Sequence, residues 1–249
     1  MCFDLDSSPP IEPIAGGSVA YRDIELTAAD GNRFAAFEAS ADNAAAVVVL
    51  PDVRGLFRFY EELALRFAEH GYDAVAIDYF GRTAGIEKRP SDWDYMPHVR
   101  STTLTGVTAD VAAAVDHLGS NDRPVFAVGF CFGGSNAWYM AATDLGLAGA
   151  VGFYGNPVRT DVPTGAPTVV SLVGSFSCPS RAFQGGADPG ITPEMNQVFR
   201  DAITEHGVDA EVVEFAGAPH SFFDRKQDEY ADTSADAWRH TLDFFEANR

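Results

Sequence analysis

A cysteine between two glycines is the strongest candidate for a reactive residue in this chain. The motif Gly129-x-Cys131-x-Gly133 follows the apolar run Val125–Val128 and precedes a predicted helix. This is the spacing of the nucleophile elbow, G-x-S-x-G, with sulfur in place of oxygen. The elbow strains the backbone and leaves no space for side chains two residues away, which explains both glycines. It also sets the thiol at a helix N-terminus, where unpaired N–H groups favour a thiolate.

Asp188 and His220 are the candidate partners of this thiol, because a nucleophile needs a base and the base needs a group that orients it. Each follows a predicted strand, Ser180–Gln184 and Ala210–Phe215, so each is expected at the carboxyl edge of a parallel sheet. The other five histidines lie in predicted helices, at helix ends or in an irregular stretch. Taken singly, the cysteine could be inert and buried, and the aspartate could belong to a turn or cap. The order cysteine, aspartate, histidine, each after a strand, favours a catalytic triad.

Short apolar strands alternate with amphipathic helices along most of the chain, which indicates a mainly parallel central sheet with helices on both faces. The expected strands are Ala46–Leu50, Asp73–Asp78, Pro124–Val128, Leu147–Tyr154, Ser180–Gln184 and Ala210–Phe215. The expected helices are Tyr60–His70, Thr105–Leu118, Gly133–Thr143, Glu194–His206 and Ala231–Ala247. Before them, Val19–Leu26 and Arg33–Ala39 predict a β-hairpin. The segment Thr168–Phe176 fits a strand or a helix.

The chain is expected to form a single domain over residues 19–249, because no internal repeat or linker interrupts the pattern. Residues 1–18 are rich in Pro, Gly and Ser and are interpreted as a loose lead-in. Residues 81–104 show little periodicity and are long for a plain loop, so they are a candidate covering segment.

These motifs resemble the dienelactone hydrolase family of α/β-hydrolases, from about residue 18 to the end of the chain. The match rests on GFCFGG around Cys131, GGAD ending at Asp188 and PHSFF beginning one residue before His220. The resemblance implies an α/β-hydrolase fold and a Cys-Asp-His triad that needs no metal or organic cofactor. It implies that Cys131 attacks an ester or lactone carbonyl to form a thioester, with His220 as base and Asp188 holding it.

The resemblance also assigns roles around the first predicted parallel strand. The family has a glutamate after this strand that shields and helps to activate the cysteine, and Asp52 fills that place with a side chain one methylene shorter. Like-charge repulsion from Asp52 is expected to disfavour the thiolate until substrate arrives. A turn or helix cap is the alternative role for Asp52. The backbone amides of Val53 and Phe132 are expected to form the oxyanion hole.

Arginines are the expected ligands of an anionic substrate, since a guanidinium matches a carboxylate in a bidentate fork. Arg82 occupies the place where the family binds the substrate carboxylate; a surface ion pair is its alternative role. The family's second arginine follows the histidine by four residues, where this chain has Asp224, with Arg225 one residue later. The aromatic residues Phe57, Trp93, Tyr95 and Phe222 are candidates for the pocket lining and would serve equally in packing.

The composition of this chain argues against some classes of binding partner. Its 249 residues carry 36 acidic and 17 basic side chains, a formal charge of −19, which argues against nucleic acids and anionic membrane surfaces. The acidity fits a GC-rich genome or adaptation to high salt. Three widely spaced cysteines and an N-terminus with no basic or apolar region predict a cytoplasmic protein with reduced thiols. A monomer or small homo-oligomer is expected.

The sequence thus predicts a thiol-dependent hydrolase of small esters or lactones, with an anionic, dienelactone-like substrate expected. A general carboxylesterase of the same fold is one alternative. A non-catalytic ligand-binding protein on the hydrolase scaffold is another, and a redox sensor that uses Cys131 is a third. The last would need a resolving cysteine, and neither Cys2 nor Cys178 is obviously placed for it.

Overall fold

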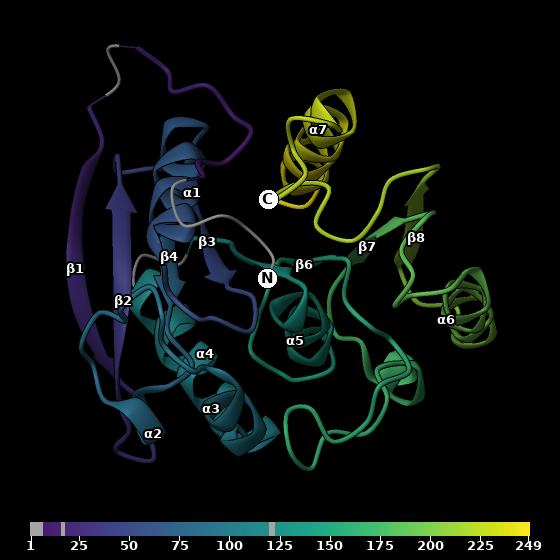
Figure 1. The fold of residues 1–249 in the computed structure, drawn as a ribbon, viewed down its shortest axis with the longest axis horizontal. Helices are drawn as coiled ribbons and strands as arrows, with labels where there is room; N and C mark the ends of the chain where they lie inside the picture. The colour runs from purple at the N-terminus through teal and green to yellow at the C-terminus, as the bar shows by residue number, and fades with distance from the viewer. Residues whose placement is uncertain (1–6, 16–17, 120–122) are drawn as a thin grey trace.

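The described part of the chain is built around one eight-stranded sheet. The computed structural model describes residues 7–15, 18–119 and 123–249. Their sheet has the order β1-β2-β4-β3-β5-β6-β7-β8 (Figure 1). The strands are β1 Ala20–Thr27, β2 Arg33–Ser40, β3 Ala45–Leu50, β4 Tyr72–Ile77, β5 Val125–Phe130, β6 Gly149–Phe153, β7 Ser180–Gly185 and β8 Ala210–Phe215. The hairpin β1–β2 is antiparallel and joins β4 antiparallel, whereas all pairs from β4 to β8 are parallel.

Helices cover both faces of the sheet, as Figure 1 shows. They are α1 Arg58–Glu69, α2 Gly81–Ala84, α3 Met96–Ser101, α4 Leu104–Leu118, α5 Phe132–Ala141, α6 Pro193–His206 and α7 Ala231–Ala247, with a 3₁₀ helix at Val170–Ser175. Residues of α1 and α7 belong to one buried apolar cluster, and residues of α4, α5 and α6 belong to a second one. The prediction of an α/β fold with helices on both faces of a mainly parallel sheet is therefore confirmed.

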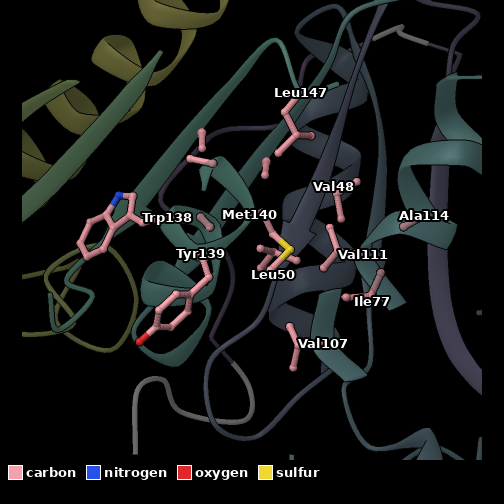
Figure 2. Packing of buried hydrophobic residues seen from close by; sticks show 14 of the residues in the cluster. Val48, Leu50, Ile77, Val107, Val111, Ala114, Trp138, Tyr139, Met140 and Leu147 are labelled. Atoms are coloured by element: carbon pink, nitrogen blue, oxygen red, sulfur yellow. The ribbon is translucent and has the colours of Figure 1, made fainter. Parts of the chain in front are cut away.

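Strand β3 shows why short apolar runs form the centre of this sheet. All six of its residues are buried, and successive side chains point to opposite faces. Val48 and Leu50 join the cluster of α4 and α5, whereas Val47 and Val49 join the cluster of α1 and α7. Figure 2 shows part of the first cluster, which includes Val48 and Leu50 of β3 and Met140 of α5. Both faces of this central strand are therefore covered by apolar side chains. Only the end of the strand lies at the edge of the sheet.

The predicted elements are recovered with small changes at their ends. The helix Ala231–Ala247 has the predicted bounds, and the predicted hairpin is present as β1 and β2. The undecided segment Thr168–Phe176 contains the 3₁₀ helix, so its strand alternative is wrong. Residues 81–104 contain α2 and α3, two helices too short to give a clear period in the sequence.

Two irregular segments are attached to the rest of the fold. Residues 7–15 form no helix or strand, but the amide of Ile14 donates to Glu69 at 3.2 Å. Residues 1–6 and 16–17 of the predicted lead-in lie outside the described residues. In residues 81–104, the ring centroid of Trp93 lies 5.1 Å from that of Phe80 and 4.8 Å from that of His98. The covering role of this segment and the single-domain organisation stay predictions.

Candidate active site

Cys131 occupies the sharp turn between β5 and α5. Its backbone has φ 56° and ψ −109°, a conformation that residues with a side chain rarely adopt. The amide of Cys131 donates to the carbonyl of Phe153 at 2.9 Å, and its carbonyl accepts from the amide of Ser135. The strained turn is therefore held from β6 and from the first turn of α5, which is the geometry of a nucleophile elbow.

The two glycines of the motif are required by close backbone contacts. A Cβ atom on Gly129 would lie 1.9 Å from the carbonyl oxygen of Gly133. A Cβ atom on Gly133 would lie 2.0 Å from the carbonyl oxygen of Leu50, at the end of the neighbouring strand. Any side chain at either position would displace backbone, so the glycines let β3, β5 and α5 approach at the thiol.

Asp188 and His220 form the hydrogen-bonded pair that the sequence predicts. Oδ2 of Asp188 lies 2.6 Å from Nδ1 of His220, and Oδ1 accepts from the amide of Gly190 at 2.7 Å. The aspartate side chain is 1% exposed and that of the histidine is 32% exposed. A carboxylate at Nδ1 favours the tautomer with its proton on that nitrogen, which leaves Nε2 as the basic atom.

Cys131 and His220 share one small pocket, which we call the thiol pocket. Its volume is about 60 Å³, and its lining residues are Cys131, Ser135, Tyr154, Asn156, Arg159, Gly190, Ile191 and His220. A larger cavity of about 200 Å³ lies between the β1–β2 hairpin and residues 86–89. Among the described residues that line the larger cavity, none is a cysteine, serine or histidine, so the candidate nucleophile and base lie in the thiol pocket.

The register of β3 against β5 places Asp52 at the same level of the sheet as Cys131. Leu50 pairs with Gly129 in the parallel ladder, and Asp52 and Cys131 each lie two residues further on. Asp52 is fully buried, and its Oδ1 accepts from the amide of Arg54 at 2.8 Å. The guanidinium Nε of the buried Arg54 lies 4.0 Å from the same oxygen. The sequence analysis missed Arg54, which supplies the positive charge next to this carboxylate.

The amides expected to form the oxyanion hole each come one residue after Asp52 or Cys131. Phe132 is the first residue of α5, so its N–H group has no acceptor within the helix. Val53 follows Asp52 in the loop after β3, and in the described residues its amide has no recorded acceptor. Their convergence on an oxyanion stays a prediction.

The predicted substrate arginines, Arg82 and Arg225, are not among the lining residues of the thiol pocket. Arg82 forms ion pairs with Asp30, at 2.6 Å, and with the buried Asp110 on α4. Arg225 is exposed, and its contact is made by the backbone amide, which donates to Asp224. Neither arginine is among the residues that line the thiol pocket, and Arg82 is instead paired with acids that the fold brings to it.

The predicted aromatic residues also lie outside the lining of the thiol pocket. Phe57 lies under the guanidinium of Arg54, whose Cζ is 5.6 Å from the ring centroid. Trp93 and Tyr95 pack against the apolar cluster of α4 and α5. Phe222 is fully buried in the cluster of α1 and α7. The structure therefore places these four aromatic residues in the packing role that was the alternative to lining the pocket.

Arg159 is a pocket residue that the sequence analysis missed. It is exposed and lines the thiol pocket. In the described part of the chain it has no recorded ion pair, although most of the arginines have one. Asn156 Oδ1 accepts from the amides of Val158 and Arg159, which fixes the turn after β6. The position of Arg159 after a parallel strand could have identified it as a candidate binding residue, because substrate groups bind at the carboxyl edge of a parallel sheet.

The other thiols and possible metal ligands do not form a second site in the described residues. Burial raises the pKa of Cys178 to about 11, so this thiol stays protonated at neutral pH. Cys2 lies outside the described residues. Within the ranges described, no group of histidine, cysteine and acidic side chains could hold a metal ion. No described helix is long and apolar enough to cross a bilayer.

The sheet order, the helices on both faces and the strained elbow define an α/β-hydrolase. A sequence model of the dienelactone hydrolase family matches residues 34–248, and the chain belongs to this family. It is accordingly an enzyme that hydrolyses esters or lactones.

Known proteins of this kind resemble the chain over most of its length. A Salmonella typhimurium protein named "Putative carboxymethylenebutenolidase" is 28% identical over 212 residues, 80% of this chain and 76% of the relative. A Bradyrhizobium protein named "Probable 2-oxo-3-(5-oxofuran-2-ylidene)propanoate lactonase" is 30% identical, over 79% of this chain and 81% of the relative. The crystal structure of a "Putative Dienelactone Hydrolase" from Klebsiella pneumoniae superposes with a TM-score of 0.80 at 21% identity, covering 92% of this chain and 99% of that one.

Proposed function

We propose that this enzyme hydrolyses small esters or lactones through a thioester on Cys131. The observation that supports this most directly is the 2.6 Å contact between Asp188 and His220, with His220 in the same pocket as the thiol of the elbow. Sulfur attacks the carbonyl carbon, and Nε2 of His220 receives the thiol proton. The amides of Val53 and Phe132 stabilise the oxyanion that forms.

The second half of the proposed reaction returns the enzyme to its starting state. The oxyanion collapses to a thioester as the C–O bond breaks, and His220 gives its proton to the leaving alkoxide. A water molecule then attacks the thioester, and His220 takes one of its protons. Cleavage of the C–S bond releases the carboxylic acid product and a thiolate, to which His220 returns the proton.

Asp52 is proposed to shield the thiol and help to activate it, which is the role of the family's glutamate at this place. It is fully buried and lies at the same level of the sheet as Cys131. Its carboxylate brings a negative charge to this level of the sheet. Arg54 offsets part of that charge, since its Nε lies 4.0 Å from Asp52 Oδ1.

The substrate is proposed to be a small lactone or ester that carries a carboxylate, with Arg159 binding that group. Arg159 lines the thiol pocket and, among the described residues, has no carboxylate partner of its own. The Bradyrhizobium relative is named for a lactone that bears a propanoate group. The pocket of about 60 Å³ suits a small acyl group. A guanidinium on its rim could bind a carboxylate in bidentate fashion.

The thioester is tested by trapping it. Wild-type enzyme is mixed with an activated aryl ester, quenched in acid and digested, and the acyl group is located by mass spectrometry. We expect the acyl mass on the peptide that contains Cys131 and loss of activity by about a thousand-fold in Cys131→Ala. Cys178→Ala is the matched control and should retain activity, because that thiol is buried away from the pocket. Unchanged hydrolysis by Cys131→Ala would refute the mechanism.

A general carboxylesterase remains the second candidate, because a neutral ester would use the same thiol, base and oxyanion amides. The two candidates differ in the use of Arg159. Comparing kcat/KM for an anionic five-membered lactone with that for a neutral aryl ester of similar size separates them. Equal values for the two substrates would favour the general esterase.

A further inference from the structure

The buried carboxyl of Asp224 has no role in the reaction proposed above, although it is hydrogen-bonded to Tyr154, which lines the thiol pocket. Asp224 follows His220 by four residues and is fully buried. Its Oδ2 accepts from the hydroxyl of Tyr154 at 2.6 Å, and its Oδ1 accepts from the amide of Arg225 at 2.5 Å. Both oxygens therefore have a donor, which fixes the orientation of the carboxyl.

Tyr154 links this carboxyl to the catalytic imidazole. It comes directly after β6, and its backbone has φ 38°, a conformation that a tyrosine keeps only when its surroundings impose it. Its ring centroid lies 4.9 Å from that of His220, and it lines the thiol pocket. The phenol is thus held at one end by Asp224, while its ring packs on the imidazole.

Asp224 is also coupled electrostatically to the site. Burial is the largest cause that raises the pKa of Asp224 to about 7, and the negative charge of Asp52 raises it further. The hydrogen bonds from Tyr154 and from the amide of Arg225 lower it, as does the positive charge of His220. These groups come from the loop after β3, the end of β6 and the segment after β8. The pKa of this carboxyl therefore lies close to neutral pH.

We propose that Asp224 is a positioning residue, which holds Tyr154 against the imidazole of His220 and whose negative charge supports the imidazolium formed during acyl transfer. This inference rests on the proposed function, since it takes His220 as the base. The imidazolium attracts the ionised Asp224, so the ionised form should favour the step in which His220 holds the proton.

The test compares Asp224→Asn, Tyr154→Phe and the matched control Asp228→Asn. The control makes the same change at an exposed aspartate of the same segment. The pKa of His220 is followed by NMR in a Cys131→Ala background, with His117, which pairs with Glu38, as internal reference. We expect Asp224→Asn to lower the pKa of His220 and Asp228→Asn to leave it unchanged, because only the first removes a buried charge near the imidazole.

The second readout is the pH dependence of kcat in enzymes that retain Cys131. Asp224→Asn and Tyr154→Phe should each lower kcat roughly ten-fold with little change in KM, because both loosen the imidazole. Asp224→Asn should also remove an ionisation near pH 7, whereas Tyr154→Phe should keep this ionisation but move it to higher pH, because the hydrogen bond from Tyr154 lowers the pKa of Asp224. If Asp224→Asn does not fold, the Tyr154→Phe variant tests the proposal instead. A wild-type kcat in Tyr154→Phe would overturn the proposal.

The two proposals can fail separately. If Cys131→Ala hydrolysed esters normally, the thioester mechanism would fail, yet the titration of His220 would still report its electrostatic coupling to Asp224. If Asp224→Asn gave the same His220 titration and the same kcat profile as Asp228→Asn, the positioning role would be overturned while the mechanism stood.

Discussion

Two arginines of this enzyme, Arg82 and Arg159, both follow a parallel strand, but only one of them reaches the thiol pocket. Arg82 follows β4 and is paired with Asp30 and Asp110, a group we call the Arg82 cluster. Arg159 follows β6 and, in the described residues, has no recorded acidic partner. A strand-end cation is therefore available to a substrate only where the fold brings no carboxylate against it.

The largest expected effect tests whether the thiol pocket, rather than the Arg82 cluster, carries the chemistry. Asp188→Asn should lower kcat by about a thousand-fold or more, because the amide removes the charge that fixes the tautomer of His220. Asp110→Asn makes the same change in the Arg82 cluster and should leave kcat within about three-fold of wild type, provided that circular dichroism shows it folded. Comparable losses of kcat in the two variants would break the distinction between the regions.

The second expected effect compares the buried carboxyls of the two regions through stability. Burial raises the pKa of Asp224 from 3.8 to about 7 and that of Asp110 to about 6. Each group stays protonated in the folded state over a pH range in which the unfolded chain ionises, so the folded state loses stability as pH rises through that range. For Asp224 the loss amounts to at most about 4 kcal/mol.

Asparagine cannot ionise and should remove this loss. Relative to wild type, Asp224→Asn should gain stability between pH 4 and pH 7.5, and Asp110→Asn should gain less, over a range that ends near pH 6. Urea denaturation at a series of pH values measures both. A stability difference between Asp224→Asn and wild type that stays constant with pH would show that the Asp224 carboxyl ionises normally.

The third expected effect concerns substrate charge. Arg159→Gln should raise KM for an anionic lactone ten- to a hundred-fold, since a hydrogen bond to a charged group contributes about 1.5–3 kcal/mol. KM for a neutral aryl ester should stay unchanged. Arg82→Gln is the comparison variant, and its KM ratio for the two substrates should match that of wild type. A rise in KM for the anionic lactone in Arg82→Gln alone would reverse the assignment and restore the original prediction.

The contrast between these arginines shows what could be predicted from the sequence. Cys131, Asp188 and His220 were predicted because each follows an apolar strand, and a parallel sheet places such residues at one edge. An ion pair was the alternative role of Arg82, but its partners could not be predicted in this way, because they come from the β1–β2 turn and from α4. Those contacts depend on how distant elements pack.

The same limit applies to the direction of side chains. Phe222 lies only two residues from His220, and the sequence analysis proposed it for the pocket, but its ring is fully buried. Asp224 was noted only as a departure from the family pattern, because nothing in the sequence indicates that the carboxyl would meet the hydroxyl of Tyr154. Strand ends are fixed by local pattern, whereas a loop side chain takes its direction from the packed core.

The smallest expected effect uses salt to separate the local charge of the thiol pocket from the charge of the whole molecule. The formal charge of −19 repels an anionic substrate at long range, whereas Arg159 attracts it only at short range. Raising ionic strength shortens the screening length from about 10 Å at 0.1 M to about 3 Å at 1 M and so weakens the repulsion first. We therefore expect kcat/KM for the anionic lactone to rise about two-fold with added salt, while that for a neutral aryl ester stays flat. A fall for the anionic lactone alone would mean that attraction extends beyond the pocket, and that the arginines outside it, Arg82 included, contribute to substrate capture.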